Sequence, residues 1–369
     1  MGFTQPSAGY REPEQLEFYP TFGRLHKRRP EWRLSIHGRV VKPRPDNLRR
    51  RLILRMIKRV LKATPEQLDS DIFRERAAGF LCVPRNRRRV RIRLGDRNLK
   101  LNKRSRRSGH FLGNIRMTEY DASMIAIGGQ RDDFAADNAW WAFDGCTKRA
   151  NGWSDGVVQM VGRVGPSVIS DIDDTIKWSN VASRRELIAN TFFRPFREID
   201  GMARLYRDWA AQGTAFHYVS SSPWQLYRPL SDFLEQSEFP AGSFHLRALR
   251  LRDPSVLQLV VGRHRSKRRS IKRILKSFSS RQFVLVGDTG EKDPEIYGSV
   301  ARKYPNQIAQ ICVRRIPEEP LDYSRLKHAF REIPKDRWRV FESPAELADL
   351  FPQPNFGWQR TRMSGSPSL

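Results

Sequence analysis

Three apolar runs in the second half of the chain each end in a polar motif, and helical patterns lie between them. The runs, with the polar residues that follow them, are 166–170 before Asp171 and Asp173, 214–219 before Ser220, and 283–286 before Asp288. Helical periodicity is present over 202–209 and 224–234. Strands that alternate with helices favour βαβ units, so this order predicts an α/β fold with a parallel sheet. The polar residues are then expected at the carboxyl edge of the sheet, where open α/β sheets bind their ligands.

Asp171 and Asp173 are the first of these polar residues. Side chains two apart on an extended chain point the same way, so both carboxylates are expected in one crevice. Two bare carboxylates repel a phosphate, but Mg²⁺ bridges carboxylate and phosphate oxygens. In that arrangement Asp171 can be the nucleophile that forms an aspartyl-phosphate. Asp173 can protonate the leaving alkoxide and then activate water.

The later motifs supply the remaining parts of a phosphate site. Ser220 places a hydroxyl at a strand end, and Lys267 opens the helical pattern 271–278 with a fixed positive charge. Asp288 directs a further carboxylate toward the metal, and Asp293 follows five residues later. The predicted phosphate-binding residues are Thr175, Ser220, Ser221 and Lys267, and the predicted Mg²⁺ residues are Asp171, Asp173, Asp288 and Asp293.

Taken singly, these residues have ordinary structural explanations. An Asp-x-Asp pair occurs by chance on many surfaces, Ser220 can satisfy backbone at a strand end, and Lys267 can be a solvated helix charge. Asp174 points away from its neighbours and is expected only to cap the following turn. The order and spacing of the motifs favour the catalytic interpretation for the others.

The segments 170–177, 218–227 and 287–297 read SDIDDTIK, YVSSSPWQLY and GDTGEKDPEIY. They resemble the haloacid-dehalogenase-type phosphatase superfamily and, within it, the actin-patch-associated phosphatidate phosphatases, over about residues 164–316. A weaker likeness to the β-rich amino-terminal domain of that family begins near Phe18. There, residues 108–111 read SGHF where the family tends to show a Gly-Tyr-Phe turn.

The resemblance implies a role for each site residue. The implied roles are nucleophile for Asp171, acid/base for Asp173, phosphate binding for Ser220 and Lys267, and metal binding for Asp288 and Asp293. The family usually has a His-Lys pair where this chain has Ser266 and Lys267.

The 369 residues, of which 39% are hydrophobic, are enough for two packed domains. Residues 165–355 are predicted to form a haloacid-dehalogenase-like Rossmannoid parallel sheet with helices on both faces. Residues 1–164 are predicted to form a basic, antiparallel, sandwich-like β-rich domain. Residues 356–369 are expected to be a disordered tail.

The formal net charge of +28 indicates attraction to anionic surfaces or substrates, whether lipid or nucleic acid. Residues 46–63 have the pattern of a basic amphipathic helix, which either lies in a membrane interface or packs on the β domain. Residues 81–107 contain twelve Lys or Arg and a single acid, Asp96. Such a patch is attracted to an anionic leaflet and to nucleic-acid phosphates alike.

The cysteines Cys82, Cys146 and Cys312 fit neither a disulfide framework nor a zinc site, which indicates a reducing compartment. The chain has no apolar run of membrane-spanning length, and residues 1–30 have no signal-like apolar region. We therefore expect a cytoplasmic protein that associates with membranes peripherally.

The function that fits best is a Mg²⁺-dependent phosphatidate phosphatase that yields diacylglycerol and phosphate at a membrane surface. Only 48 residues separate Asp171 from Ser220, and 46 separate Ser220 from Lys267, which leaves little room for a large lid. A small flap is possible over 176–199, whose aromatic residues are expected to be partly buried and partly at the rim. The alternatives are a nucleic-acid end phosphatase and a catalytically inert peripheral membrane-binding protein.

Overall fold

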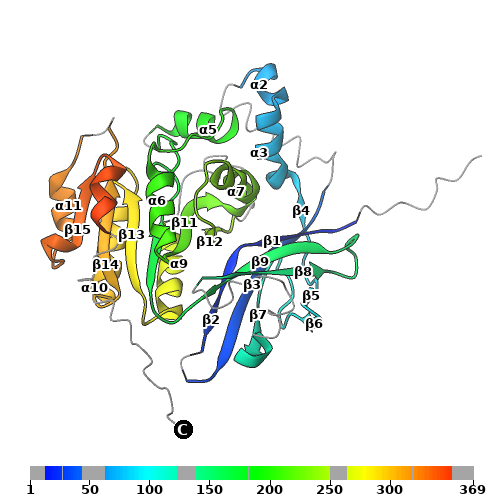
Figure 1. Ribbon diagram of the computed structural model, residues 1–369. Coiled ribbons are helices and arrows are strands. Elements are labelled where there is room, and N and C mark those ends of the chain that lie inside the picture. Colours follow the sequence, from blue (N-terminus) through cyan, green and yellow to red (C-terminus); the bar gives the residue numbers. More distant parts are fainter. Residues whose placement is uncertain are drawn as a thin grey trace, which may run out of the picture.

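The computed structural model describes residues 13–26, 28–43, 63–122, 138–181, 183–249, 264–317 and 320–350. These residues form a mixed α/β structure with two sheets, one in each half of the chain (Figure 1). The amphipathic helix predicted at 46–63 and the tail predicted at 356–369 lie outside the described residues, apart from Ala63.

The second half contains the predicted parallel sheet, which is confirmed. Its strands, in spatial order, are β12 Gly242–Arg247, β11 Ala215–Pro223, β10 Pro166–Ser170, β13 Gln282–Asp288, β14 Ile308–Arg314 and β15 Trp338–Phe341. Every neighbouring pair is parallel. The chain enters at β10 in the middle, builds outward to β12, and returns to build the other side from β13. The strand order therefore reverses at β10, and such switch points are where open α/β sheets hold ligands.

Helices cover both faces of this sheet, as predicted. One face packs on α5 Arg184–Phe192, α6 Met202–Ala211, η1 Trp224–Leu226, α7 Tyr227–Gln236 and η3 Pro344–Leu350. The other packs on α9 His264–Ser277, α10 Asp293–Lys303 and α11 Tyr323–Ala329. The short η2 Lys335–Arg337 leads into β15. Side chains alternate across β10, so Val168 joins the first core and Ile169 the second.

The first half is β-rich and mostly antiparallel, as predicted. Its strands are β1 Gln15–Tyr19, β2 Thr21–Leu25, β3 Glu31–Lys42, β4 Val83–Pro84, β5 Arg91–Leu94, β6 Arg97–Lys100, β7 His110–Thr118, β8 Trp140–Cys146 and β9 Ser154–Val161. They hydrogen-bond as one sheet of nine strands rather than as two separate sheets, and β2 pairs with β9 in parallel. Their inward side chains share one core, in which Phe18 contacts the rings of Phe111 and Phe143.

The two halves pack continuously against each other. Phe22 of β2 lies in the core beneath α9, and Tyr19 of β1 stacks on Trp224 with ring centroids 4.2 Å apart. Two helices of the first half, α2 Pro65–Asp69 and α3 Asp71–Leu81, lie toward the second half, where Phe73 of α3 stacks on Phe193 (Figure 1). The expected division near residue 164 thus separates the two sheets, while their side chains form a shared interior.

Candidate active site

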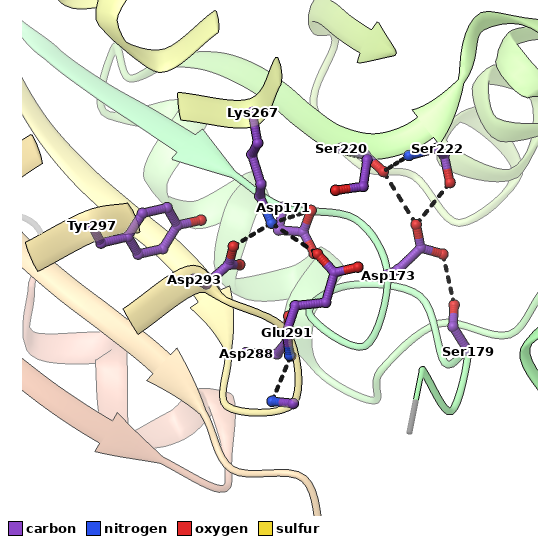
Figure 2. Close-up of polar contacts among 12 residues, drawn as sticks. Asp171, Asp173, Ser179, Ser220, Ser222, Lys267, Asp288, Glu291, Asp293 and Tyr297 are labelled. Atoms are coloured by element: carbon purple, nitrogen blue, oxygen red, sulfur yellow. Dashed lines mark hydrogen bonds and ion pairs between the residues drawn. The ribbon is translucent and has the colours of Figure 1, made fainter. Parts of the chain in front are cut away.

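A buried lysine lies at the centre of the site, among carboxylates from three elements (Figure 2). Asp171 follows β10, Asp288 ends β13, Asp293 begins α10, and Lys267 lies in the first turn of α9. Each of these four residues is at most 1% exposed. Lys267 Nζ is 2.8 Å from Asp171 Oδ1 and 3.5 Å from Glu291 Oε2, and it also pairs with Asp293 Oδ1. The structure therefore brings together the residues that the strand ends predicted.

Negative charge exceeds positive charge in this cluster, since four carboxylates surround one lysine. Burial raises the pKa of Asp171 well above its ordinary value; Lys267 opposes this rise, and the neighbouring acids Asp293, Glu291 and Asp288 add to it. Burial and Asp293 likewise raise the pKa of Asp288, and burial raises the pKa of Glu291 to about 7. Burial opposes the charge on Lys267, but Asp171 and Asp293 outweigh it and raise the pKa of the lysine. A further cation would balance such a group.

Three of these carboxylates meet the requirements of an oxygen-only metal site. One ligand oxygen from each of Asp171, Asp288 and Asp293 lies within 4.8 Å of the others. Among the described residues, no hydrogen-bond partner exists for the Oδ2 atom of any of the three. Asp288 Oδ1 accepts the backbone N–H groups of Gly290 and Glu291, both at 2.7 Å, which fixes the direction of its free oxygen. Carboxylate oxygens of this kind suit Mg²⁺ or Ca²⁺.

Asp173, which the sequence placed among the metal residues, is not part of this carboxylate group. It forms an ion pair with Lys177 at 2.9 Å and accepts hydrogen bonds from Ser179, Ser220 and Ser222 at 2.8, 3.1 and 2.9 Å. Burial opposes its ionisation, but Lys177 and the hydroxyl donors lower the pKa of Asp173 to about 2. The side chain is therefore an ionised carboxylate here.

The predicted phosphate-binding hydroxyls differ in how they are engaged. Ser220 Oγ donates to Asp173 and accepts the backbone N–H of Ser222 at 2.9 Å. Thr175 Oγ1 and Ser221 Oγ are buried, and neither has a hydrogen-bond partner among the described residues. Because unpaired buried hydroxyls are costly, these two are the donors best placed to serve a ligand.

Asp174 has the structural role expected for it. Its carboxylate accepts the backbone N–H groups of Ser179, Asn180 and Val181 at 2.7, 2.8 and 2.6 Å. Its backbone has a φ of 51°, a left-handed conformation that aspartate tolerates better than most residues. Asp174 thus caps the turn that follows Asp171 and Asp173 and holds it closed.

Sequence reasoning missed four residues of the site: Glu291, Lys177, Ser179 and Ser222. Glu291 lies inside the motif that runs from Asp288 to Asp293, and that position was the available signal. Lys177 follows Asp173 by four residues, but no periodic pattern marks the turn that brings them together. Their contacts depend on loop geometry.

The segment predicted as a possible flap, 176–199, is mixed in burial, as expected. Phe192 is fully buried, whereas Trp178, Phe193 and Phe196 are partly buried. Arg76 lies 3.3 Å from the ring centroid of Phe196. Between Asp171 and Ser220 the described residues form α5, α6, the first part of β11 and their connections, with no additional domain.

Comparison with known proteins finds matches in the second half of the chain. Residues 166–315 match the family described as phosphatidate phosphatase APP1, catalytic domain. Phosphatidate phosphatase APP1 of Saccharomyces cerevisiae is 36% identical over 154 residues, which are 41% of this chain and 26% of the relative. The uncharacterized protein C29B5.04c of Schizosaccharomyces pombe is 33% identical over 163 residues, or 43% of this chain and 26% of the relative. The predicted resemblance is confirmed for this segment, although the match spans about a quarter of each relative.

Within the described part of the chain, no helix combines the length and the apolar content needed to cross a membrane.

Proposed function

Since residues 166–315 belong to the APP1-type phosphatidate phosphatase family, we propose that this chain is a Mg²⁺-dependent phosphatidate phosphatase. The parallel sheet then has a haloacid-dehalogenase-like fold, and the reaction yields diacylglycerol and phosphate. One observation carries the proposal. The buried carboxylates of Asp171, Asp288 and Asp293 surround Lys267 at the point where the strand order reverses. Such a group suits a metal ion and a phosphoryl group better than it suits a structural role.

Asp171 is the nucleophile in this proposal. Its carboxylate oxygen forms a bond to phosphorus while the bond from phosphorus to the glycerol oxygen breaks, which leaves an aspartyl-phosphate. Lys267, 2.8 Å from Asp171, balances charge as the phosphoryl group arrives. When bound, Mg²⁺ supplies electrostatic stabilisation of the phosphoryl oxygens, and Asp171, Asp288 and Asp293 are the residues that would hold it.

Asp173 is the general acid and then the general base in this proposal. The departing glycerol oxygen takes a proton from it, and the carboxylate then removes a proton from the water that attacks the aspartyl-phosphate. In this structure Asp173 is ionised, with a pKa of about 2. A phosphoryl group beside it would raise that pKa, since a nearby negative charge favours the protonated form. Ser220 and Ser222 now donate hydrogen bonds to Asp173. With substrate bound, these hydroxyls would donate to a phosphoryl oxygen instead.

Action at a membrane surface is supported by the rim around 176–199. Trp178 and Phe196 are partly buried, and Arg197 and Arg76 lie over their rings. Aromatic side chains flanked by cations suit a lipid interface. Because Phe192 is core, a Phe192 substitution cannot separate lipid from soluble substrates. Trp178→Ser is the sharper probe, and it should lower the rate on phosphatidate vesicles more than on a soluble phosphomonoester.

Chelation tests the metal requirement. A chelator should abolish phosphate release from phosphatidate, and Mg²⁺ should restore it, whereas Zn²⁺ is not required because no His or Cys joins the group. Asp288→Ala should raise the Mg²⁺ concentration needed for half-maximal rate. Full activity in chelator would refute metal dependence, and an unchanged Mg²⁺ response in Asp288→Ala would remove Asp288 from the metal site.

A further inference from the structure

A basic cleft separate from the catalytic site lies between α9 and the β-rich sheet, where α9 runs beside the strands β2 and β3 (Figure 1). Its volume is about 650 Å³, within the range of small-ligand pockets. Eight of its eleven described lining residues are Arg or Lys, and the other three are Ser35, Asn114 and Ser277. None of these eleven is acidic, aliphatic or aromatic. The cleft shares no residue with the metal-binding carboxylates.

The outer face of α9 supplies most of the positive charge. The six cations that line the cleft from this helix are Arg265, Arg268, Arg269, Lys272, Arg273 and Lys276. They recur at spacings of three and four residues, so each lies beside another cation, and such like-charge pairs destabilise a helix. α9 contains no acidic residue that could interleave with them. The opposite face carries Lys267 and the buried residues Ile271, Ile274 and Leu275.

The β-rich side faces these cations with two arginines of its own. Arg24 of β2 lies directly opposite Arg33 of β3 in the antiparallel register, an arrangement that destabilises a sheet when the charges are alike. Arg33 has an ion pair with Glu31 at 3.4 Å. Burial and Arg33 lower the pKa of Arg24, and burial and Arg24 lower the pKa of Arg273. The repulsion therefore extends from the sheet across the cleft to α9.

The helix α9 and the strand pair β2–β3, from different halves of the chain, thus both place like charges next to one another where they face each other. Chains depart from local preferences of this kind mainly at functional sites. Arginine side chains bind phosphate groups through paired hydrogen bonds. None of the described lining residues is aromatic, which argues against stacked nucleic-acid bases, and none has an aliphatic side chain that could insert into a bilayer.

We propose that this cleft binds a compact polyphosphorylated ligand, either free in solution or as the headgroup of a polyphosphorylated lipid. The site is independent of the proposed phosphatase reaction, because its residues lie outside the catalytic group.

Calorimetric titration of the full chain with inositol hexakisphosphate tests the site, at an ionic strength of about 0.15 M so that weak surface attraction is screened. We expect saturable binding of one ligand per chain. The double variant Arg273→Glu with Lys276→Glu should weaken binding at least tenfold. It should fold at least as stably as the parent chain, since it introduces opposite charges into a row of cations.

The matched control is Lys103→Glu with Arg107→Glu, which changes net charge equally at exposed residues of the β-rich half. The affinity of the control variant for the ligand should differ from that of the parent chain by less than threefold. Absence of saturable binding, or equal weakening in both double variants, would overturn the proposal because attraction would then follow net charge alone.

Two further arms identify the source of the phosphates. Vesicles of phosphatidylcholine with and without phosphatidylinositol bisphosphate are titrated, and inositol hexakisphosphate is used as competitor. Specific, competed binding that the α9 variant loses assigns a lipid headgroup, whereas binding of the soluble ligand alone assigns a free molecule. If a single-stranded oligonucleotide binds more tightly than either and the α9 variant abolishes it, the cleft is a nucleic-acid site and the proposal is wrong.

Discussion

Lys177 and the neighbouring hydroxyl groups determine the protonation state of the Asp173 carboxylate. Lys177 and three serine hydroxyls hold it ionised, so the acid role that we propose for it requires that a substrate alter these contacts. Asp173→Asn should therefore lower turnover of phosphatidate severely. A substrate with a good leaving group should recover part of the rate, because such a group needs little protonation. Steady-state phosphate release from the two substrates makes the comparison, and equal losses on both would contradict an acid role.

Thr175 offers a second test at the scale of one residue. Its buried hydroxyl has no partner among the described residues, so Thr175→Val should leave the free energy of unfolding within about 1 kcal/mol of the parent value. If the hydroxyl binds a phosphoryl oxygen, kcat/KM should fall about tenfold or more. Thr214→Val is the control, because Thr214 is equally buried and unpaired but precedes β11, at the opposite edge of the sheet. A rate unchanged in both variants would exclude Thr175 from phosphate binding.

The sequence indicated the position of a residue best where a strand end fixes it. Asp171 and Asp288 follow apolar strands, and parallel strands bring their carboxyl ends to one edge. Lys267 was found because it precedes an amphipathic helical pattern. The metal assignment of Asp173 had no such basis, since it depended on alternation in an extended chain, whereas residues 173–177 form a turn. That turn directs Asp173 toward Lys177, Ser220 and Ser222.

At the scale of elements, Arg281 stabilises the connection between the two sheets through hydrogen bonds. It is 1% exposed, and its guanidinium donates to Ser167 Oγ at 2.8 Å and to the carbonyl oxygens of Gly162, Val164 and Pro166. These acceptors lie between the end of β9 and the beginning of β10, so one side chain fixes where the strand that carries Asp171 begins.

Arg281→Met should lower the free energy of unfolding by about 3 kcal/mol, since it leaves buried carbonyl groups without donors. Urea unfolding monitored by circular dichroism measures the loss. Arg204→Met, at an exposed position on α6, is the matched control and should change stability by less than about 0.5 kcal/mol. Equal changes in the two variants would show that the network does not stabilise the connection.

Sequence patterns predicted the alternating strands and helices of the second half, because apolar runs and helical periodicity are local signals. The same patterns predicted a β-rich first half, but they did not indicate that hydrogen bonds join its nine strands in one sheet. The parallel strands β2 and β9 of this sheet are far apart in the sequence, and no local pattern marks their contact. The hydrogen bonds of Arg281 are long-range contacts of the same kind.

At the scale of the whole molecule, burial lowers the pKa of four histidines, His37, His110, His217 and His245, and this makes the stability of the fold depend on pH. Burial lowers the pKa of His217 well below its ordinary value, and burial lowers the pKa of His110 to about 3. The unfolded chain, where histidine has a pKa of about 6.5, then binds more protons than the folded chain at mildly acidic pH. The stability contributed by these neutral side chains is complete above pH 6.5 and is lost as pH falls toward the folded values.

We expect each such histidine to reduce the free energy of unfolding by about 2 kcal/mol between pH 6.5 and pH 5. Denaturant titrations across this interval measure the slope. His110→Gln should make the slope shallower, whereas the exposed His328→Gln should leave it unchanged. An identical slope in His110→Gln would show that His110 is not kept neutral by folding.

The two halves of the molecule were predicted as separate domains, and the sequence could not indicate how they pack. Tyr19 and Phe22 read as ordinary strand residues, yet they insert into the interior beside Trp224 and α9. The basic cleft arises from the same packing, because its cations come from both halves and meet only after folding. Shared surfaces of this kind depend on tertiary contacts that periodicity does not encode.

The central claim is that Asp171 attacks the phosphomonoester of a lipid. The most direct measurement is phosphate release from phosphatidate in mixed micelles with Mg²⁺, for the parent chain and for Asp171→Asn, beside release from a 5′-phosphorylated oligonucleotide. We predict faster release from phosphatidate than from the oligonucleotide, and loss of activity in Asp171→Asn, because an amide cannot form the aspartyl-phosphate. Faster release from the oligonucleotide, or retention of about a tenth of the parent rate by Asp171→Asn, would contradict the account.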